Sequence, residues 1–129
     1  MKFASLRPRS EKEIQSWFLK KKTPVSKQKE YLTRLSELEM LGDEKFALWW
    51  VEQRSAFRPR SRRHLTWELR QKGIDQKIIK EVLESVDEVQ TAQKLIAKKS
   101  FASRQKLEEY LARRGFDWEA IKKVKLEQE

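Results

Sequence analysis

The side chains best suited to chemistry in this sequence are arginines and lysines, whose positive charges bind phosphate oxygens. The chain carries 30 Lys and Arg against 20 Asp and Glu, a formal net charge of +10 at pH 7. Its most basic segment runs from Arg54 to Lys72 and contains a predicted turn, Arg58 to Arg63, that leads into a helix. A helix start normally favours acidic residues, so arginines there indicate an external polyanion. A solvated loop is the alternative interpretation.

Residue types needed for catalysis or metal binding are scarce. The sequence has a single histidine, His64, and no cysteine, and it lacks a glycine-rich phosphate loop and a His-Glu-x-x-His motif. In the internal repeats described below, the positions equivalent to His64 are Glu13 and Lys106, so a surface histidine is expected. We therefore expect no enzymatic activity, no metal and no cofactor.

The composition favours an all-α fold. Glu, Lys, Arg, Gln and Leu dominate, and only three glycines and three prolines interrupt them. No apolar run is long enough for a signal peptide or a membrane span. We expect a cytoplasmic protein with no membrane contact.

The chain repeats itself. Ser61 to Asp75 aligns without gaps with Ser103 to Asp117, and a weaker copy begins at Ser10. Three copies fill the sequence, which predicts units at residues 1–42, 43–86 and 87–129.

Each copy contains the signals of helix ends. Serines at the starts are predicted N-caps, and Ser10 with Glu13 forms a capping-box pattern. Gly73 and Gly115 stand where a left-handed residue closes a helix. A further helix precedes each of these pairs, and Asp43 is expected to cap the one that carries Phe46 and Trp50. In the first copy, Lys20 to Pro24 replaces the glycine cap.

These patterns predict three tandem three-helix repeats, about nine short helices in all. The first copy is short, with its leading helix reduced to Phe3–Leu6. One thin amphipathic unit cannot bury its apolar face alone, so the repeats are expected to stack into an elongated, curved, right-angled-helix solenoid. We expect a monomer.

A second basic cluster occupies the inter-helix turn that corresponds to Arg58–Arg63 one repeat later. Equivalent turns of stacked repeats lie along one face, so the two turns could form a single stripe. The residues predicted to contact DNA or a DNA-bound protein partner are Arg54, Arg58, Arg60, Arg62, Arg63, Lys72, Lys98, Lys99, Arg104, Lys106, Arg113 and Arg114.

Most of the five tryptophans are expected to be structural. Trp50 shares a face with Phe46 and is predicted to be core, while Trp17 and Trp118 are expected to cover seams between repeats. Trp67 aligns with Glu109, which indicates an exposed position. It is the one tryptophan predicted as a candidate partner contact.

The sequence resembles the RecX regulatory family in three blocks. The first is Leu32–Leu41 followed by the Asp-Glu-x-Phe-Ala start at Asp43. The second is Arg60–Ile74, which ends in Glu-Leu-x-x-Lys-Gly-Ile. The third is Lys106–Phe116, which matches Lys-Leu-x-x-x-Leu-x-x-Arg-Gly-Phe. Their order and spacing are those of the family.

The resemblance implies a non-catalytic protein that binds the RecA–DNA filament and modulates RecA, commonly by inhibition. It also implies binding to single- and double-stranded DNA with low sequence preference. Two alternatives remain at this point. One is a DNA-binding helical module that acts without RecA. The other is a membrane-surface protein that uses Trp49 and Trp50.

Overall fold

The computed structural model describes residues 7–38 and 40–126. This part of the chain forms eight α-helices and no named strand, which confirms the all-α prediction. The helices are α1 (Glu11–Lys21), α2 (Val25–Glu37), α3 (Asp43–Phe57), α4 (Arg62–Gln71), α5 (Gln76–Leu83), α6 (Glu88–Ile96), α7 (Arg104–Arg113) and α8 (Trp118–Lys123). The helix expected over Phe3–Leu6 lies outside the described residues.

The buried apolar side chains form three separate cores rather than one. The first lies between α1 and α2, around Ile14, Phe18 and Leu35. The second holds α3, α4 and α5 together, and the third does the same for α6, α7 and α8. We refer to these groups of helices as the first, second and third repeats. Because each repeat encloses its own core, the contacts between repeats are left largely to polar groups at helix ends.

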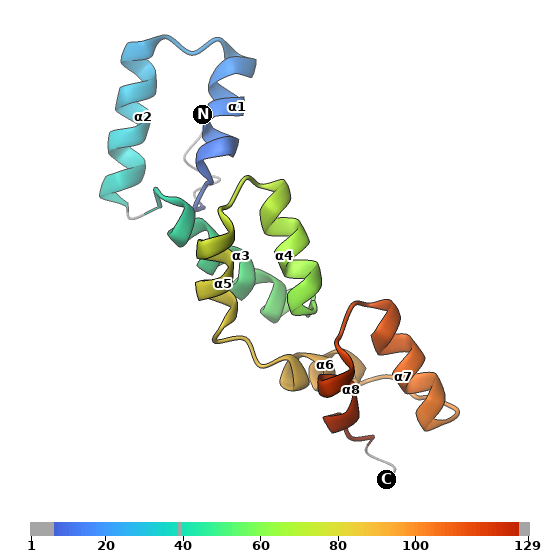
Figure 1. The fold of residues 1–129 in the computed structure, drawn as a ribbon. Coiled ribbons are helices and arrows are strands. Elements are labelled where there is room, and N and C mark those ends of the chain that lie inside the picture. Colours follow the sequence, from blue (N-terminus) through green and yellow to red (C-terminus); the bar gives the residue numbers. More distant parts are fainter. Residues whose placement is uncertain (1–6, 39, 127–129) are drawn as a thin grey trace.

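The repeats follow one another in an elongated arrangement (Figure 1). The molecule exposes 9086 Å² of surface, whereas a compact monomer of this mass would expose about 7,300 Å². The expected elongated shape is therefore confirmed.

A serine caps the N-terminus of each of the helices α1, α4 and α7, as predicted; we call these the middle helices, after their place in the predicted three-helix repeat. The hydroxyls of Ser10, Ser61 and Ser103 accept the backbone N–H three residues later, at 3.1, 3.1 and 3.2 Å. Caps of this kind contribute about 1 kcal/mol each. Ser10 and Ser61 are buried and Ser103 is exposed, because only the first two are covered by a following repeat.

The same three helices end in residues with positive φ: 51° at Lys22, 80° at Gly73 and 89° at Gly115. In each helix, the residue that follows the positive-φ position donates its N–H to the carbonyl of a buried residue in the last turn. These closing bonds run from Thr23 to Phe18 (3.0 Å), from Ile74 to Leu69 (3.0 Å) and from Phe116 to Leu111 (3.2 Å). The glycine caps are thus confirmed. Lys22 retains the same closure without a glycine, although a side chain at positive φ costs about 1 kcal/mol.

Each middle helix directs its N-terminus at the C-terminus of the next middle helix. At the first seam, between the first and second repeats, Lys12 Nζ donates to the Gln71 carbonyl at 3.3 Å. At the second seam, between the second and third repeats, Ser61 Oγ donates to the Arg114 carbonyl at 3.0 Å. Helices α1, α4 and α7 therefore form a row in which opposite ends of helix dipoles meet, a favourable arrangement (Figure 1).

The two cap glycines are also required for this close approach. A Cβ at Gly73 would lie 2.9 Å from Lys12 Cβ, and one at Gly115 would lie 2.9 Å from Ser61 Oγ. A larger residue at either position would force the neighbouring side chain, and the contact that it makes at the seam, to shift.

The leading helix of each later repeat also caps the preceding middle helix. Asp43 Oδ1 accepts the Glu11 N–H at 2.9 Å, and Glu88 Oε1 accepts the Arg62 N–H at 2.9 Å. The prediction that Asp43 caps its own helix is wrong, because Gly42 occupies that position and Asp43 is the first residue of α3. Its carboxylate serves the neighbouring repeat instead.

Replacing Gly73 or Gly115 with valine should lower the free energy of unfolding by more than about 1 kcal/mol in each case. A β-branched residue is strained at positive φ, and its Cβ would meet the preceding repeat. Denaturant unfolding followed by circular dichroism measures the loss. The control Gln105→Val, at an exposed helical position, should cost no more than about 0.5 kcal/mol. If the two valine variants have the same free energy of unfolding as the wild type, these glycines are not left-handed caps.

Ser61→Ala should be more destabilising than Ser103→Ala. Both variants lose an N-cap worth about 1 kcal/mol. Only Ser61→Ala also removes the donor to the Arg114 carbonyl at a buried seam, which adds about 1 kcal/mol. The same unfolding measurement compares the two, and equal losses would show that the hydroxyl contributes nothing to the seam.

Candidate nucleic-acid interface

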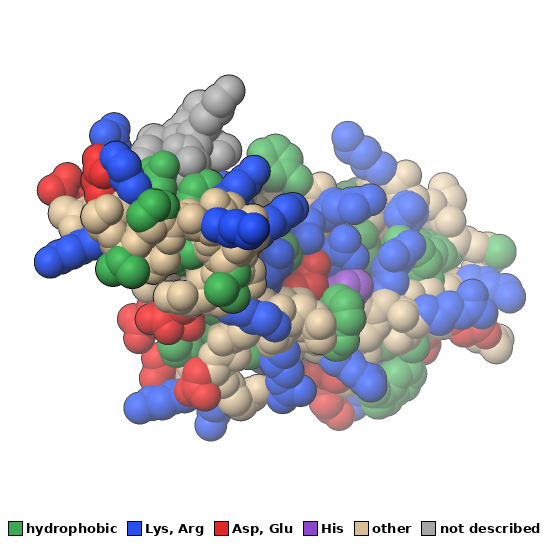
Figure 2. Space-filling model, turned by 90° about the horizontal axis from the view of Figure 1, so that it is seen from above, with side chains coloured by type: hydrophobic (Ala, Val, Ile, Leu, Met, Phe, Trp, Pro, Cys, Tyr) green, Lys and Arg blue, Asp and Glu red, His purple; other side chains and the backbone are tan. Residues whose placement is uncertain are grey.

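Five of the predicted basic residues gather at the second seam, because the start of α4 docks on the end of α7. They are Arg58 and Arg60 in the turn before α4, Arg63 in its first turn, and Arg113 and Arg114 at the end of α7. The position of a Cβ on Gly115 is only 3.7 Å from Arg63 Cβ. Figure 2 shows Lys and Arg side chains around the only histidine, His64.

At the first seam, a carboxylate neutralises the equivalent basic residues. The Glu13 carboxylate lies 2.8 Å from Arg7 Nη2 and 3.4 Å from Lys72 Nζ, and it accepts the Ser10 N–H at 3.2 Å. Burial alone would raise the pKa of Glu13, but the hydrogen bonds from Arg7 and Ser10 and the charge of Lys72 hold it below its ordinary value. Glu13 is therefore ionised and balances this seam.

His64 occupies the position of Glu13 at the second seam, so the carboxylate is missing there. Arg58, the counterpart of Arg7, is exposed, and its guanidinium has no ion-pair partner among the described residues. Arg60 Nη1 lies 3.5 Å from His64 Nε2, and Arg60 Nε is buried without a hydrogen-bond partner in the described part of the chain. The second seam thus has the cations of the first without its anion.

Arg54, predicted as a site residue, has a partner within its own repeat. Its guanidinium lies 2.9 Å from Glu68 Oε2 and 4.6 Å from the centre of the Trp50 ring. Glu68 is buried and also accepts the Trp50 indole N–H at 3.4 Å. Sequence reasoning missed this network, since Glu68 stands in a basic segment and gives no sign of burial.

The side chains of Arg62 and Arg104 donate hydrogen bonds to backbone carbonyls. Arg62 Nε donates to the Val86 carbonyl at 2.9 Å, in the link between α5 and α6. Arg104 Nη2 donates to the Ile121 carbonyl at 2.8 Å, within the third repeat. The internal partners of Arg62 explain an arginine at the start of α4 without an external anion. Arg63 is the other arginine in the first turn of α4, and the described residues provide no partner for it. It is therefore the residue at this helix start that still indicates an external anion.

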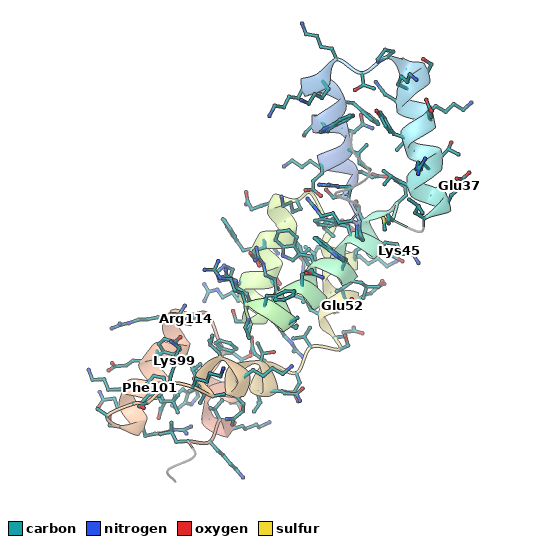
Figure 3. All side chains as sticks on the ribbon, turned by 180° about the vertical axis from the view of Figure 1, so that it is seen from behind. Glu37, Lys45, Glu52, Lys99, Phe101 and Arg114 are labelled. Carbon is teal, nitrogen blue, oxygen red and sulfur yellow. The ribbon has the colours of Figure 1, made fainter. Side chains whose placement is uncertain are left out.

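Tyr110 joins the second basic cluster to the seam. Arg114 lies over the Tyr110 ring at 4.4 Å and Lys99 at 5.5 Å, and Phe101 packs against the same ring at 5.3 Å. Figure 3 shows Arg114, Lys99 and Phe101 one after another along this side of the third repeat. The basic surface therefore continues from the second seam onto the turn between α6 and α7. The sequence analysis did not identify Tyr110.

The remaining basic residues predicted in this cluster lie further along the third repeat. Lys98 is exposed in the turn before α7. Lys106, in the first turn of α7, is exposed and lies 3.7 Å from Glu109 in a surface ion pair. About 10 Å of rise along α7 separates Lys106 from Arg113.

The structure distinguishes the tryptophans clearly. Trp49 and Trp50 are half-buried against Phe46, so they do not form an exposed membrane-binding pair. Trp17 packs inside the first repeat rather than at a seam, and Trp118 is 56% exposed, so both of those expectations were wrong. Trp67 is 61% exposed, as predicted.

Other kinds of site find no support in the described residues. No group of three His, Cys, Asp or Glu side chains there is arranged to hold a metal ion. None of the described helices is long and apolar enough to cross a membrane.

Comparison with known proteins agrees with the repeat architecture. Residues 43–83 match the second three-helix domain of RecX and residues 86–124 match the third. A crystal structure of RecX from Lactobacillus salivarius superposes with a TM-score of 0.69 at 21% identity, covering 93% of this chain and 85% of that one. That likeness shows a shared fold.

Sequence similarity extends to curated relatives named regulatory protein RecX. The protein of Pelodictyon phaeoclathratiforme is 31% identical over 129 residues, which cover 94% of this chain and 81% of the relative. That of Chlorobium phaeobacteroides is 33% identical over 125 residues, with 92% and 83% covered. The RecX of Streptomyces coelicolor is 32% identical over 120 residues, and the match spans 64% of its length. With both domain matches and these relatives, the chain belongs to the RecX family of regulatory proteins.

Proposed function

We propose that this protein binds the RecA–DNA filament and inhibits RecA. Family membership supports a regulatory role, and the sequence resemblance implies RecA as the target. The elongated row of repeats suits a protein that lies along a filament. We infer that the protein is a monomer, acts in the cytoplasm and is not an enzyme. We also infer that it binds single- and double-stranded DNA, within the filament or outside it.

One observation carries the DNA contact: His64 stands where Glu13 stands one repeat earlier. The first seam is a complete ion cluster, whereas the second has the same architecture and lacks the anion. A DNA phosphate placed near His64 would supply that negative charge to Arg58, Arg60 and Arg63. Contacts of this kind recognise the backbone rather than the bases, so low sequence preference follows.

His64→Glu tests this assignment because it builds the missing carboxylate into the chain. The free energy of unfolding of the variant should be higher by about 0.5–1 kcal/mol, since the new carboxylate would repeat the capping box and ion pairs of Glu13. It should also bind DNA more weakly, because the carboxylate competes with phosphate. The plot of log K against log salt should flatten by about 0.9 for each phosphate that the variant no longer binds.

Gln15→Glu is the matched control, since it adds one negative charge at an exposed position in the first repeat. Its salt dependence should remain that of the wild type. If both variants weaken DNA binding equally, net charge rather than the second seam governs binding. If neither does, the seam is only a solvated surface.

A separate measurement tests the action on RecA. Wild-type protein should lower the ATPase rate of RecA on single-stranded DNA and slow strand exchange, and His64→Glu should require a higher concentration for the same effect. Stimulation of RecA would contradict inhibition. DNA binding with no change in RecA activity would instead favour the alternative of a helical DNA-binding module that acts without RecA.

A further inference from the structure

Trp67 is a large apolar side chain that the fold does not use. It lies on α4 with 61% of its surface exposed, on the side opposite the buried Leu65 and Leu69. The equivalent positions in the other repeats are Ser16 and Glu109, both polar. The architecture therefore places no demand for an indole at this point of the middle helix.

Guanidinium groups flank this indole on one face of α4. At 100° per residue, Arg63, Trp67 and Arg70 fall within about 60° of one another around the helix axis. Arg63 has no interaction partner in the described part of the chain, and Arg70 bonds only to the neutral Gln76 side chain, at 2.7 Å from Nη2. Both positive charges are thus uncompensated beside the exposed ring.

The ring has one aromatic neighbour on its own helix, His64 at the second seam. The two ring centroids lie 6.4 Å apart and the ring planes are perpendicular, at 89°. This contact leaves 61% of the Trp67 side chain exposed, enough for a flat ligand to reach the indole. Arg60, on the far side of His64, connects this pair to the cation cluster of the seam.

An exposed aromatic ring between two cations complements a nucleotide, which combines a flat base with phosphates on either side. In a duplex the faces of the bases are covered by stacking, so only an unpaired strand can present one. We propose that α4 is a single-strand stacking site, in which one base lies on Trp67 while Arg63 and Arg70 contact the flanking phosphates. This inference deepens the proposed function and rests on its DNA contact.

The experiment compares Trp67→Ala with Trp118→Ala, which removes another exposed tryptophan from a different repeat. Fluorescence anisotropy measures binding to labelled oligothymidylate and to a duplex of the same length. Trp67→Ala should weaken single-strand binding by about 5- to 150-fold, the effect of one stacked base, with duplex binding unchanged within about twofold. Trp67→Phe should restore most of the loss, and Trp118→Ala should bind both DNAs like the wild type.

Several outcomes would overturn the stacking site. One is an equal loss on single strands and duplex, which is the behaviour of a phosphate contact or a misfolded variant; unfolding curves separate these two. Another is normal single-strand binding by Trp67→Ala together with a lost effect on RecA filaments, since the indole would then contact protein. The salt slope of Trp67→Ala should equal that of the wild type. A failed His64→Glu test with an intact Trp67 effect would reject the phosphate assignment and leave the stacking site standing.

Discussion

At each seam, a side chain at the start of one of the helices α1 and α4 donates to a carbonyl at the end of the next helix in the row, and this contact determines how the repeats meet. At the second seam, Ser61 accepts an amide of its own helix and donates to the last carbonyl of α7, so one oxygen joins two helix ends. Because every repeat encloses its own core, these end-to-end contacts define the row of middle helices. The glycine at each C-terminus follows from the same constraint, since a side chain there would collide with the preceding helix start. The arginines around the seam are positioned by this docking.

The two seams show how one position decides whether the positive charges at a repeat junction are neutralised within the chain. At the first, Glu13 is ionised and satisfies Arg7, Lys72 and the Ser10 amide. At the second, an imidazole takes its place, and Arg114 turns to the face of Tyr110 instead. Neither arrangement changes the backbone caps. Charge at the seam can therefore vary between repeats without disturbing the stacking.

Much of the fold could be predicted from the sequence because helix caps are local. Serine N-caps and glycine C-caps are satisfied within a few residues, and the apolar spacing between them identifies each repeat's core. The partners of Asp43, Arg54 and Arg62 could not be predicted, since they depend on which groups meet across the fold or a seam. For the same reason, a list of basic residues does not separate those that hold carbonyls from those with free charge. In the sequence, only the alignment of Glu13 with His64 indicated that the basic residues of the second seam lack a neutralising carboxylate.

Uncompensated arginines have an energetic consequence for the protein itself. Like charges at the second seam repel one another, and the buried Arg60 Nε lacks a hydrogen-bond partner within the described chain, so both features cost free energy at this junction. If a polyanion binds there as proposed, it would relieve both costs and by linkage would stabilise the docked arrangement of the second and third repeats. The affinity for such a ligand and the rigidity that it would give to the seam both depend on the charge that the second seam lacks. On this proposal, binding would stiffen the elongated molecule at the junction that the ligand occupies.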